Sequence, residues 1–168
     1  MSQESDTLQD GGGRVRIVTA PIDVARVIAS VAGPESGAIS VFLGTVREES
    51  LGQRVLFLEY EAYLPMAEHE LRAIVRLLPV EFGPSRVAIE HRLGRLEIGE
   101  TSVAIAVASP HRRVAIAACA EAIERVKKTV PIWKKEHFEG GAVWIEGDAR
   151  SPAVRGGVVA GGGGRDRD

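Results

Sequence analysis

The chain has 168 residues, 45% of them hydrophobic and 26% charged, with a formal net charge of −2, which suits one globular domain with its own core. The slight acidic excess and an aromatic content of only 5% argue against a nucleic-acid-binding protein. The single cysteine, Cys119, excludes an internal disulfide and a multi-cysteine metal site, and indicates a reducing, cytoplasmic location.

The two ends of the sequence differ from its middle. Residues 1–13 are polar and finish in three glycines, and residues 151–168 include a run of four glycines at 161–164. Glycine has high backbone entropy and no side chain to bury, so we expect flexible tails around a folded domain at 14–150. The start, MSQESDTLQD, is unlike a secretory signal, and no apolar run is long enough to span a bilayer.

Apolar periodicity predicts the first elements of the domain. Their order is a strand at 14–19, a helix at 22–32, a strand at 38–47, a polar turn at 48–52 and a strand at 55–63. The last of these strands is predicted to place Leu56, Leu58 and Tyr60 on one face. A helix follows at 65–78, with Pro65 in its first turn.

Two strands, at 85–94 and 101–109, precede the longest predicted helix, at 112–129, and a last strand is expected at 142–146. Strand 101–109 has valine and isoleucine on one face and alanine on the other. Both faces are apolar, which predicts a central strand with a helix over the alanine face. Helices separated by strands with mostly short connections indicate an α+β fold.

The stretch VKKTVPIWKKEHF (126–138) places two lysine pairs around a proline and a tryptophan. The apolar stripe predicted for helix 112–129 consists of Ile116, Cys119, Ala120, Ile123, Val126 and Val130. Lys127 lies about 50° from the centre of this stripe and Lys128 about 150°. Lys127 therefore needs an anion, a carbonyl group or a cleft, whereas Lys128 points to water. The alternative is that Lys127 extends along the core edge to solvent.

Pro131 should end the helix and turn the chain, so that Lys134 returns toward the cleft that Lys127 faces. Two amines in one pocket suit an anionic substrate or acid/base chemistry. Further basic residues lie at the ends of predicted elements: Arg47, His91, Arg92, His111 and Arg112. Because His111 and Arg112 stand at a helix N-terminus, they are candidates for a phosphate clamp, although strand-end and helix-end cations are usually ordinary surface residues.

Several chemistries are excluded or disfavoured. The sequence has no P-loop and no G-x-S-x-G elbow. The four histidines have no i, i+4 pair, so a zinc site is not indicated. Cys119 lies mid-helix on the apolar stripe and is expected to be a packed core thiol.

Four segments, FLGTVR (42–47), LEYEAYLPMAEHEL (58–71), EHRLGRLEIGETSVAIAVASPHRRVAIAAC (90–119) and KKTVPIWKKE (127–136), together resemble one family. The sequence is similar, over most of residues 14–146, to the large catalytic subunit of molybdopterin synthase, the MoaE family. The resemblance implies an α/β-hammerhead type of two-layer fold, with a mixed or antiparallel sheet and packed helices.

The resemblance also implies an activity in molybdenum cofactor biosynthesis. A family enzyme transfers two sulfur atoms to cyclic pyranopterin monophosphate and so forms the dithiolene of molybdopterin. The sulfur comes as a thiocarboxylate on the C-terminal Gly-Gly of a ubiquitin-like small subunit, whose tail enters a pocket of the large subunit. Family members form a homodimer, and a heterotetramer with two small subunits. No metal or organic cofactor is expected.

Position by position, the resemblance implies that Lys127 and Lys134 are catalytic. It assigns substrate binding to Arg47, His111, Arg112 and Arg92, and a channel for the partner's tail to Phe42 and Lys134. The loop EESLGQRV after Arg47 departs from the family, in which an asparagine is common there.

Two other functions stay open at this point. One is a non-catalytic subunit that keeps the fold and only docks a partner. The other is a hydrolase or transferase for a phosphoryl ligand, using His111 with a carboxylate such as Glu136.

Overall fold

Residues 13–145 are described in a computed structural model of the chain. The elements are β1 (Gly13–Val18), α1 (Val24–Val31), β2 (Ala38–Thr45), β3 (Glu49–Ser50), β4 (Gln53–Ala62), α2 (Leu64–Phe82), β5 (Arg86–Arg92), β6 (Gly94–Glu97), β7 (Thr101–Ser109), α3 (Arg112–Thr129), β8 (Ile132–Phe138) and β9 (Gly141–Ile145). The predicted tails 1–13 and 151–168 lie outside the described residues, except for Gly13, which begins β1.

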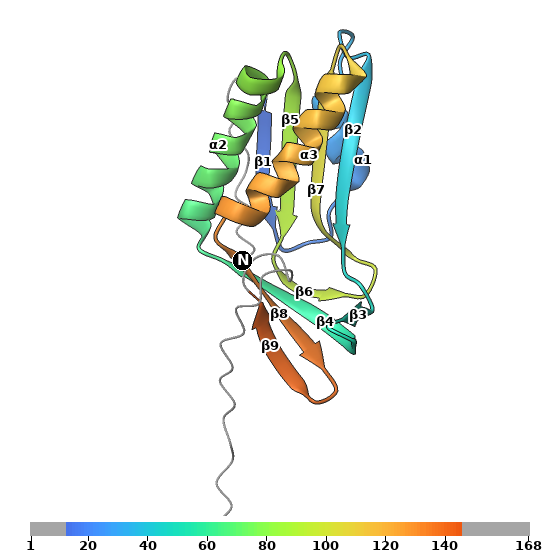
Figure 1. Ribbon diagram of the computed structural model, residues 1–168, viewed down its shortest axis with the longest axis vertical. Coiled ribbons are helices and arrows are strands. Elements are labelled where there is room, and N and C mark those ends of the chain that lie inside the picture. Colours follow the sequence, from blue (N-terminus) through green and yellow to red (C-terminus); the bar gives the residue numbers. More distant parts are fainter. Residues whose placement is uncertain (1–12, 146–168) are drawn as a thin grey trace, which may run out of the picture.

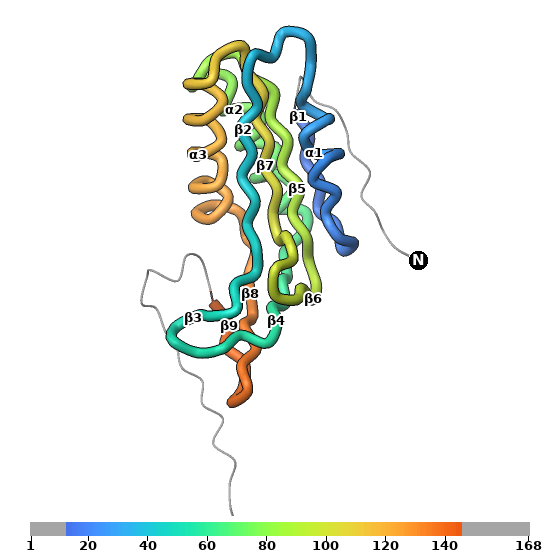
Figure 2. The backbone as a smooth tube through the Cα atoms, turned by 90° about the vertical axis from the view of Figure 1, so that its right-hand side faces the viewer, coloured from blue at the N-terminus to red at the C-terminus, as the bar shows by residue number. Residues whose placement is uncertain are grey.

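The main sheet has the strand order β1-β5-β7-β2 (Figure 1). It is mixed, because β1 and β5 are parallel whereas β5–β7 and β2–β7 are antiparallel. Helices α2 and α3 cover one face and α1 covers the other, as the turned view in Figure 2 shows. The predicted α+β class is confirmed, and α1 adds a third layer to the two that were expected.

Strand β7 lies inside this sheet, between β5 and β2, as its two apolar faces predicted. Its valine and isoleucine face belongs to the core under α2 and α3. Its alanine face, with Ala104, Ala106 and Ala108, packs against Val27 and Val31 of α1. Both sequence expectations for this strand are therefore confirmed.

Helix α3 has the predicted bounds and ends before Pro131. Its buried residues are Ala115, Ala118, Cys119, Ala122, Ile123 and Val126. The predicted stripe was wrong at Ile116, which is 59% exposed, and at Ala120, which is also exposed. Small alanines face the sheet because the helix lies directly on β2 and β7, and hydropathy alone does not reveal that preference. The buried face is thus rotated, so Lys127 lies about 110° from its centre.

The second sheet, below the main one in Figure 1, has the order β3-β4-β8-β9, with β6 also paired to β4. Strand β8 was predicted as a turn, because four consecutive polar residues, 134–137, hide its alternation. The predicted turn at 48–52 contains β3, and the predicted strand 85–94 divides into β5 and β6 around Leu93.

Two further corrections concern β4 and α2. A register shift between Val55 and Phe57 turns Leu56 outward, so Leu56 is 40% exposed while Val55 and Leu58 are buried. The predicted shared face of Leu56, Leu58 and Tyr60 was therefore wrong at Leu56. Helix α2 begins with Pro65 in its first turn, as expected, but continues to Phe82. Within residues 13–145, no helix combines the length and the apolar character that a membrane span requires.

Candidate active site

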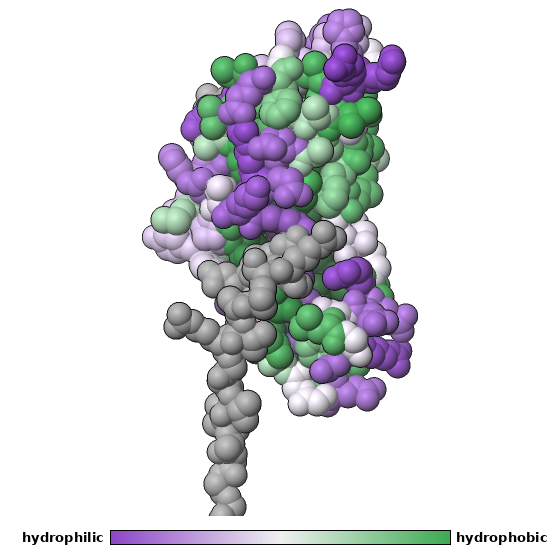
Figure 3. All heavy atoms as spheres, in the orientation of Figure 1, coloured by the Kyte–Doolittle hydropathy of each residue, from purple (hydrophilic) through white to green (hydrophobic). Residues whose placement is uncertain are grey.

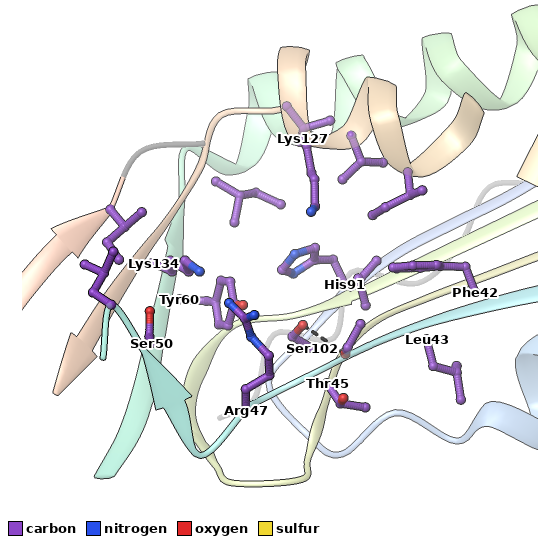
Figure 4. Close-up of a pocket in the computed structure, with 18 residues that line it drawn as sticks. Phe42, Leu43, Thr45, Arg47, Ser50, Tyr60, His91, Ser102, Lys127 and Lys134 are labelled. Carbon is purple, nitrogen blue, oxygen red and sulfur yellow. Dashed lines mark hydrogen bonds between the residues drawn. The ribbon is translucent and has the colours of Figure 1, made fainter. Parts of the chain in front are cut away.

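A pocket of about 610 Å³ lies where the two sheets meet (Figure 4). Its walls come from the last turns of α3, from β2, β5 and β7 of the main sheet, and from β4, β8 and β9 of the second sheet. The polar side chains in its wall are Thr45, Arg47, Ser50, Tyr60, His91, Ser102, Lys127 and Lys134.

Lys127 and Lys134 both line this pocket, which confirms the prediction that the two amines reach one cleft. Figure 4 shows the amine of Lys127, in the last turn of α3, pointing into the pocket. Lys128, its neighbour, is not among the lining residues. Lys134 is held by strand β8 rather than by a turn, and its strand partner on β4 is Tyr60.

The alternation of β8 separates Lys134 from Lys135. Lys134 points to the pocket, and its amine lies 3.0 Å from a carboxylate oxygen of Glu136, two residues on along the strand. Lys135 lies on the other face of the strand, where its amine stands 5.4 Å from the ring centre of Trp144. One lysine of the pair is therefore a pocket residue and the other a surface residue.

Glu136 is a buried carboxylate, 2% exposed. One oxygen pairs with Lys134, and the other has no hydrogen-bond partner among the described residues. Because a buried carboxylate is costly without a cation, Glu136 holds the amine of Lys134 at a defined position in the pocket wall.

Arg47 follows β2, and Figure 4 shows its guanidinium pointing into the pocket near Tyr60. Together with Lys127 and Lys134 it brings three cations to a wall in which the described residues place no carboxylate. Such a pocket favours anionic groups. Phe42, from β2, adds an aromatic ring to the same wall.

Three predicted substrate-binding residues lie elsewhere in this chain. His111 and Arg112 are exposed at the N-terminus of α3, fifteen residues before Lys127, which is about 22 Å along a helix. Arg92 is buried outside the pocket, where its guanidinium donates to Glu100 and to the backbone oxygen of Arg95. Arg92 thus anchors the β6–β7 connection, and within one chain none of the three reaches the pocket.

The pocket residue that sequence reasoning missed is His91, the neighbour of Arg92. It is 5% exposed and shares the inward face of β5 with Val87 and Ile89. Its Nδ1 lies 2.9 Å from the backbone oxygen of Arg92, and its ring meets the Tyr60 ring edge-on. The alternation of β5 was the available signal, since it separates His91 from Arg92 by face.

Burial lowers the pKa of His91 from its ordinary 6.5 to about 4, and the hydrogen bond to the Arg92 carbonyl opposes this only in part. The ring is therefore neutral near pH 7. Because a carbonyl oxygen can only accept, Nδ1 carries the hydrogen and Nε2 keeps its lone pair.

This pKa predicts how stability changes with pH. Between pH 6.5 and about 4 the unfolded chain binds a proton at His91 and the folded chain does not, so the free energy of unfolding falls as the pH falls. The loss is about 3 kcal/mol and is complete near pH 4. Urea denaturation at pH 7.5 and pH 4.5 measures it. His91→Asn should lose less stability over that range than the wild-type chain, and identical losses would contradict the burial argument.

Two other groups are reported for completeness of the chemistry. Burial raises the pKa of the Cys119 thiol, which is 3% exposed, in line with a packed core thiol. Within residues 13–145, no three His, Cys, Asp or Glu side chains gather in a way that could hold a metal ion.

Comparison with known proteins identifies the family. The sequence profile of the MoaE protein family matches residues 17–129. The chain belongs to the MoaE family. It is 49% identical over 132 residues to the molybdopterin synthase catalytic subunit of Halalkalibacterium halodurans, covering 79% of this chain and 85% of that protein. To the subunit of the same name from Pyrococcus abyssi it is 42% identical, covering 86% and 99%.

Solved structures of MoaE relatives have the same fold. The crystal structure of molybdopterin synthase from Staphylococcus aureus aligns with a TM-score of 0.75 at 43% identity, over 77% of this chain and 94% of that one. A subunit complex of molybdopterin-converting factor from Helicobacter pylori aligns with a TM-score of 0.65 at 21% identity, over 82% and 92%, a likeness of fold. The resemblance found in the sequence motifs is thereby confirmed.

Proposed function

We propose that the chain is the catalytic subunit of a molybdopterin synthase and acts in molybdenum cofactor biosynthesis. The prediction of this enzyme function is confirmed at the level of the family, since the relatives above carry that name. The observation that carries the assignment to this chain is the pocket that joins Lys127 and Lys134, the two positions that match the family's catalytic lysines.

The substrate we propose is cyclic pyranopterin monophosphate, and the sulfur donor is a thiocarboxylate on the C-terminal glycine of a small ubiquitin-like subunit. The phosphate and the thiocarboxylate are both anions, which suits the three cations of the pocket. The Helicobacter pylori neighbour is a complex of two subunits, which supports a partner of this kind. We keep a cytoplasmic location as part of the same proposal.

Sulfur transfer would proceed in two steps for each sulfur. The thiocarboxylate sulfur forms a bond to a side-chain carbon of the pterin, which leaves the partner attached through an acyl thioester. Water then cleaves the acyl–sulfur bond, so sulfur stays on the pterin and the partner departs as a carboxylate. Lys127 stabilises the negative charge that develops on the oxygen or sulfur.

The other residues of the pocket have supporting roles in this proposal. Lys134, oriented by Glu136, holds the thiocarboxylate and helps to expel the partner. Phe42 lines the passage for the partner's glycine tail, and Arg47 binds the phosphate.

His111 and Arg112 require a second copy of the chain if they bind the same substrate, because about 22 Å of helix separates them from Lys127. We therefore propose a homodimer, and a heterotetramer with two small subunits. Strand β2 is an edge of the main sheet, and its side chains Ile39, Val41 and Leu43 are each about 40% exposed. Figure 3 shows hydrophobic side chains along that edge, which suits contact with another protein surface.

The phosphoryl-transfer alternative is disfavoured by the positions of its two residues. His111 is exposed at the start of α3, whereas Glu136 is buried in β8 and engaged with Lys134. A general base and its carboxylate must lie within hydrogen-bonding reach of each other or of one substrate. Within one chain these two side chains do not.

The test is incubation of the purified chain with cyclic pyranopterin monophosphate and thiocarboxylated small subunit, followed by detection of the dithiolene product. We expect product only when both are present. Turnover of the phosphate compound without the small subunit would favour the hydrolase alternative. Binding of the small subunit without any product would identify a docking subunit that has lost catalysis.

A further inference from the structure

The hydrolytic half of the proposed reaction needs a hydrogen-bond acceptor in a pocket rich in donors. A water molecule attacks a thioester with a lone pair while one of its hydrogens is held by an acceptor. Protonated lysine and arginine side chains can only donate. The cations of Arg47, Lys127 and Lys134 can therefore hold anions but cannot take a proton from the attacking water.

His91 is placed to supply that acceptor. Of the described side chains that line the pocket, its imidazole combines a free-standing lone pair on nitrogen with the ability to bind a proton. Nδ1 is committed to the backbone oxygen of Arg92 at 2.9 Å, which fixes the tautomer and the plane of the ring. Figure 4 shows the ring between Tyr60 and the amine of Lys127, at the centre of the pocket residues.

We propose that His91 is a catalytic residue for the release step, in which its Nε2 takes a proton from the water that hydrolyses the acyl thioester. This role rests on the proposed function. It assigns to the pocket a proton carrier that is separate from the two lysines, and it divides the reaction into a lysine-dependent attack and a histidine-dependent release.

The step balances without any further reactant. The water oxygen forms a bond to the acyl carbon as one O–H bond breaks and its proton moves to Nε2. The acyl carbon–sulfur bond then breaks with its electron pair on sulfur, and the proton moves from Nε2 to sulfur. The partner leaves as a carboxylic acid, which ionises, and the pterin keeps a thiol.

The burial of His91 suits a carrier rather than a store of protons. A charged imidazolium is disfavoured in this environment, so the proton passes on to sulfur, whose thiol has an ordinary pKa of about 8.5. The ring returns to its neutral form after each release and is ready for the second sulfur.

The test uses His91→Asn in the complete complex with thiocarboxylated small subunit and cyclic pyranopterin monophosphate. The asparagine amide can keep the donation to the Arg92 carbonyl and lacks the Nε2 acceptor. We expect release of dithiolene product to slow about 100-fold, and a covalent adduct of small subunit and pterin to accumulate in intact-protein mass spectra. Lys127→Ala should accumulate no adduct, because the attack itself is impaired.

Two variants serve as controls for folding and for histidine loss in general. His69→Asn, at an exposed position on α2, should turn over at the wild-type rate. His91→Gln carries an amide near the Nε2 position and loses the bond to Arg92, so it should accumulate less adduct than His91→Asn if the pocket acceptor matters. Thermal denaturation of both His91 variants establishes that the compared proteins are folded.

The outcomes separate this role from the function on which it rests. Wild-type product together with normal turnover of His91→Asn would overturn the His91 role alone. Loss of product in folded His91→Asn without any adduct would also overturn it, because the defect would then lie in the attack. A wild-type complex that makes no product would overturn the proposed function and this role with it.

Discussion

Lys127→Ala is expected to lower sulfur transfer by a factor of about 100 to 1,000, because it removes a positioned charge from the site where negative charge develops. Lys128→Ala is the matched control. Both lysines stand in the last turn of α3, so each substitution removes the same favourable interaction with the helix C-terminus. Only Lys127 lines the pocket, so the two variants should have similar stability and very different activity.

The measurement is single-turnover formation of dithiolene with saturating small subunit, alongside urea denaturation of each variant. We expect Lys128→Ala to stay within about twofold of wild type, as surface substitutions usually do. Equal loss of activity in the two variants, or loss in neither, would remove Lys127 from the proposed mechanism. Lys127→Arg should recover part of the rate if charge, rather than an amine that exchanges protons, is what the site requires.

The sequence predicted the core elements well where side-chain patterns were simple. The bounds of β7 and α3 agree with the prediction because each has a long, regular apolar pattern between clear end signals. Pro131 marked the end of α3 for a local steric reason that needs no tertiary information. The convergence of Lys127 and Lys134 followed from that short connection and is confirmed by the pocket.

Other features depended on tertiary packing and could not be predicted from local pattern. Strand β8 contains the polar run 134–137, and it is a strand because β4 and β9 pair with it on both sides. Burial of Glu136 follows from that pairing. His91 is a pocket residue because β5 ends where α3, β4 and β7 meet, and a single-strand pattern contains no information about that junction.

The positions of His111 and Arg112 illustrate a further limit. Their place before α3 was predicted correctly, and a helix N-terminus does favour anions. Their distance from Lys127 follows simply from the length of the same helix. Residues that belong to one predicted site can therefore lie at opposite ends of one element, and only an assembly of two chains would unite them.

Lys134→Met is expected to lower both activity and stability, in contrast to Lys127→Ala. The substitution keeps an unbranched side chain of similar length but leaves the buried carboxylate of Glu136 without its cation. Removing one partner of a buried ion pair costs about 3 kcal/mol, because the remaining charge stays desolvated. Lys135→Met is the control: it removes the neighbouring cation from the outer face, where only a contact with Trp144 worth about 0.5 to 1 kcal/mol is lost.

The double variant Lys134→Met with Glu136→Gln separates the two effects of this pair. Glutamine carries no charge, so the unpaired-charge penalty disappears and most of the lost stability should return. Sulfur transfer should stay as low as in Lys134→Met, because the amine that holds the thiocarboxylate is still absent. Urea denaturation and the dithiolene assay on the same preparations test both statements. If Lys134→Met were as stable as Lys135→Met, Glu136 would not depend on this cation. If the double variant regained activity, Lys134 would act only by neutralising Glu136, and its proposed contact with the sulfur donor would be wrong.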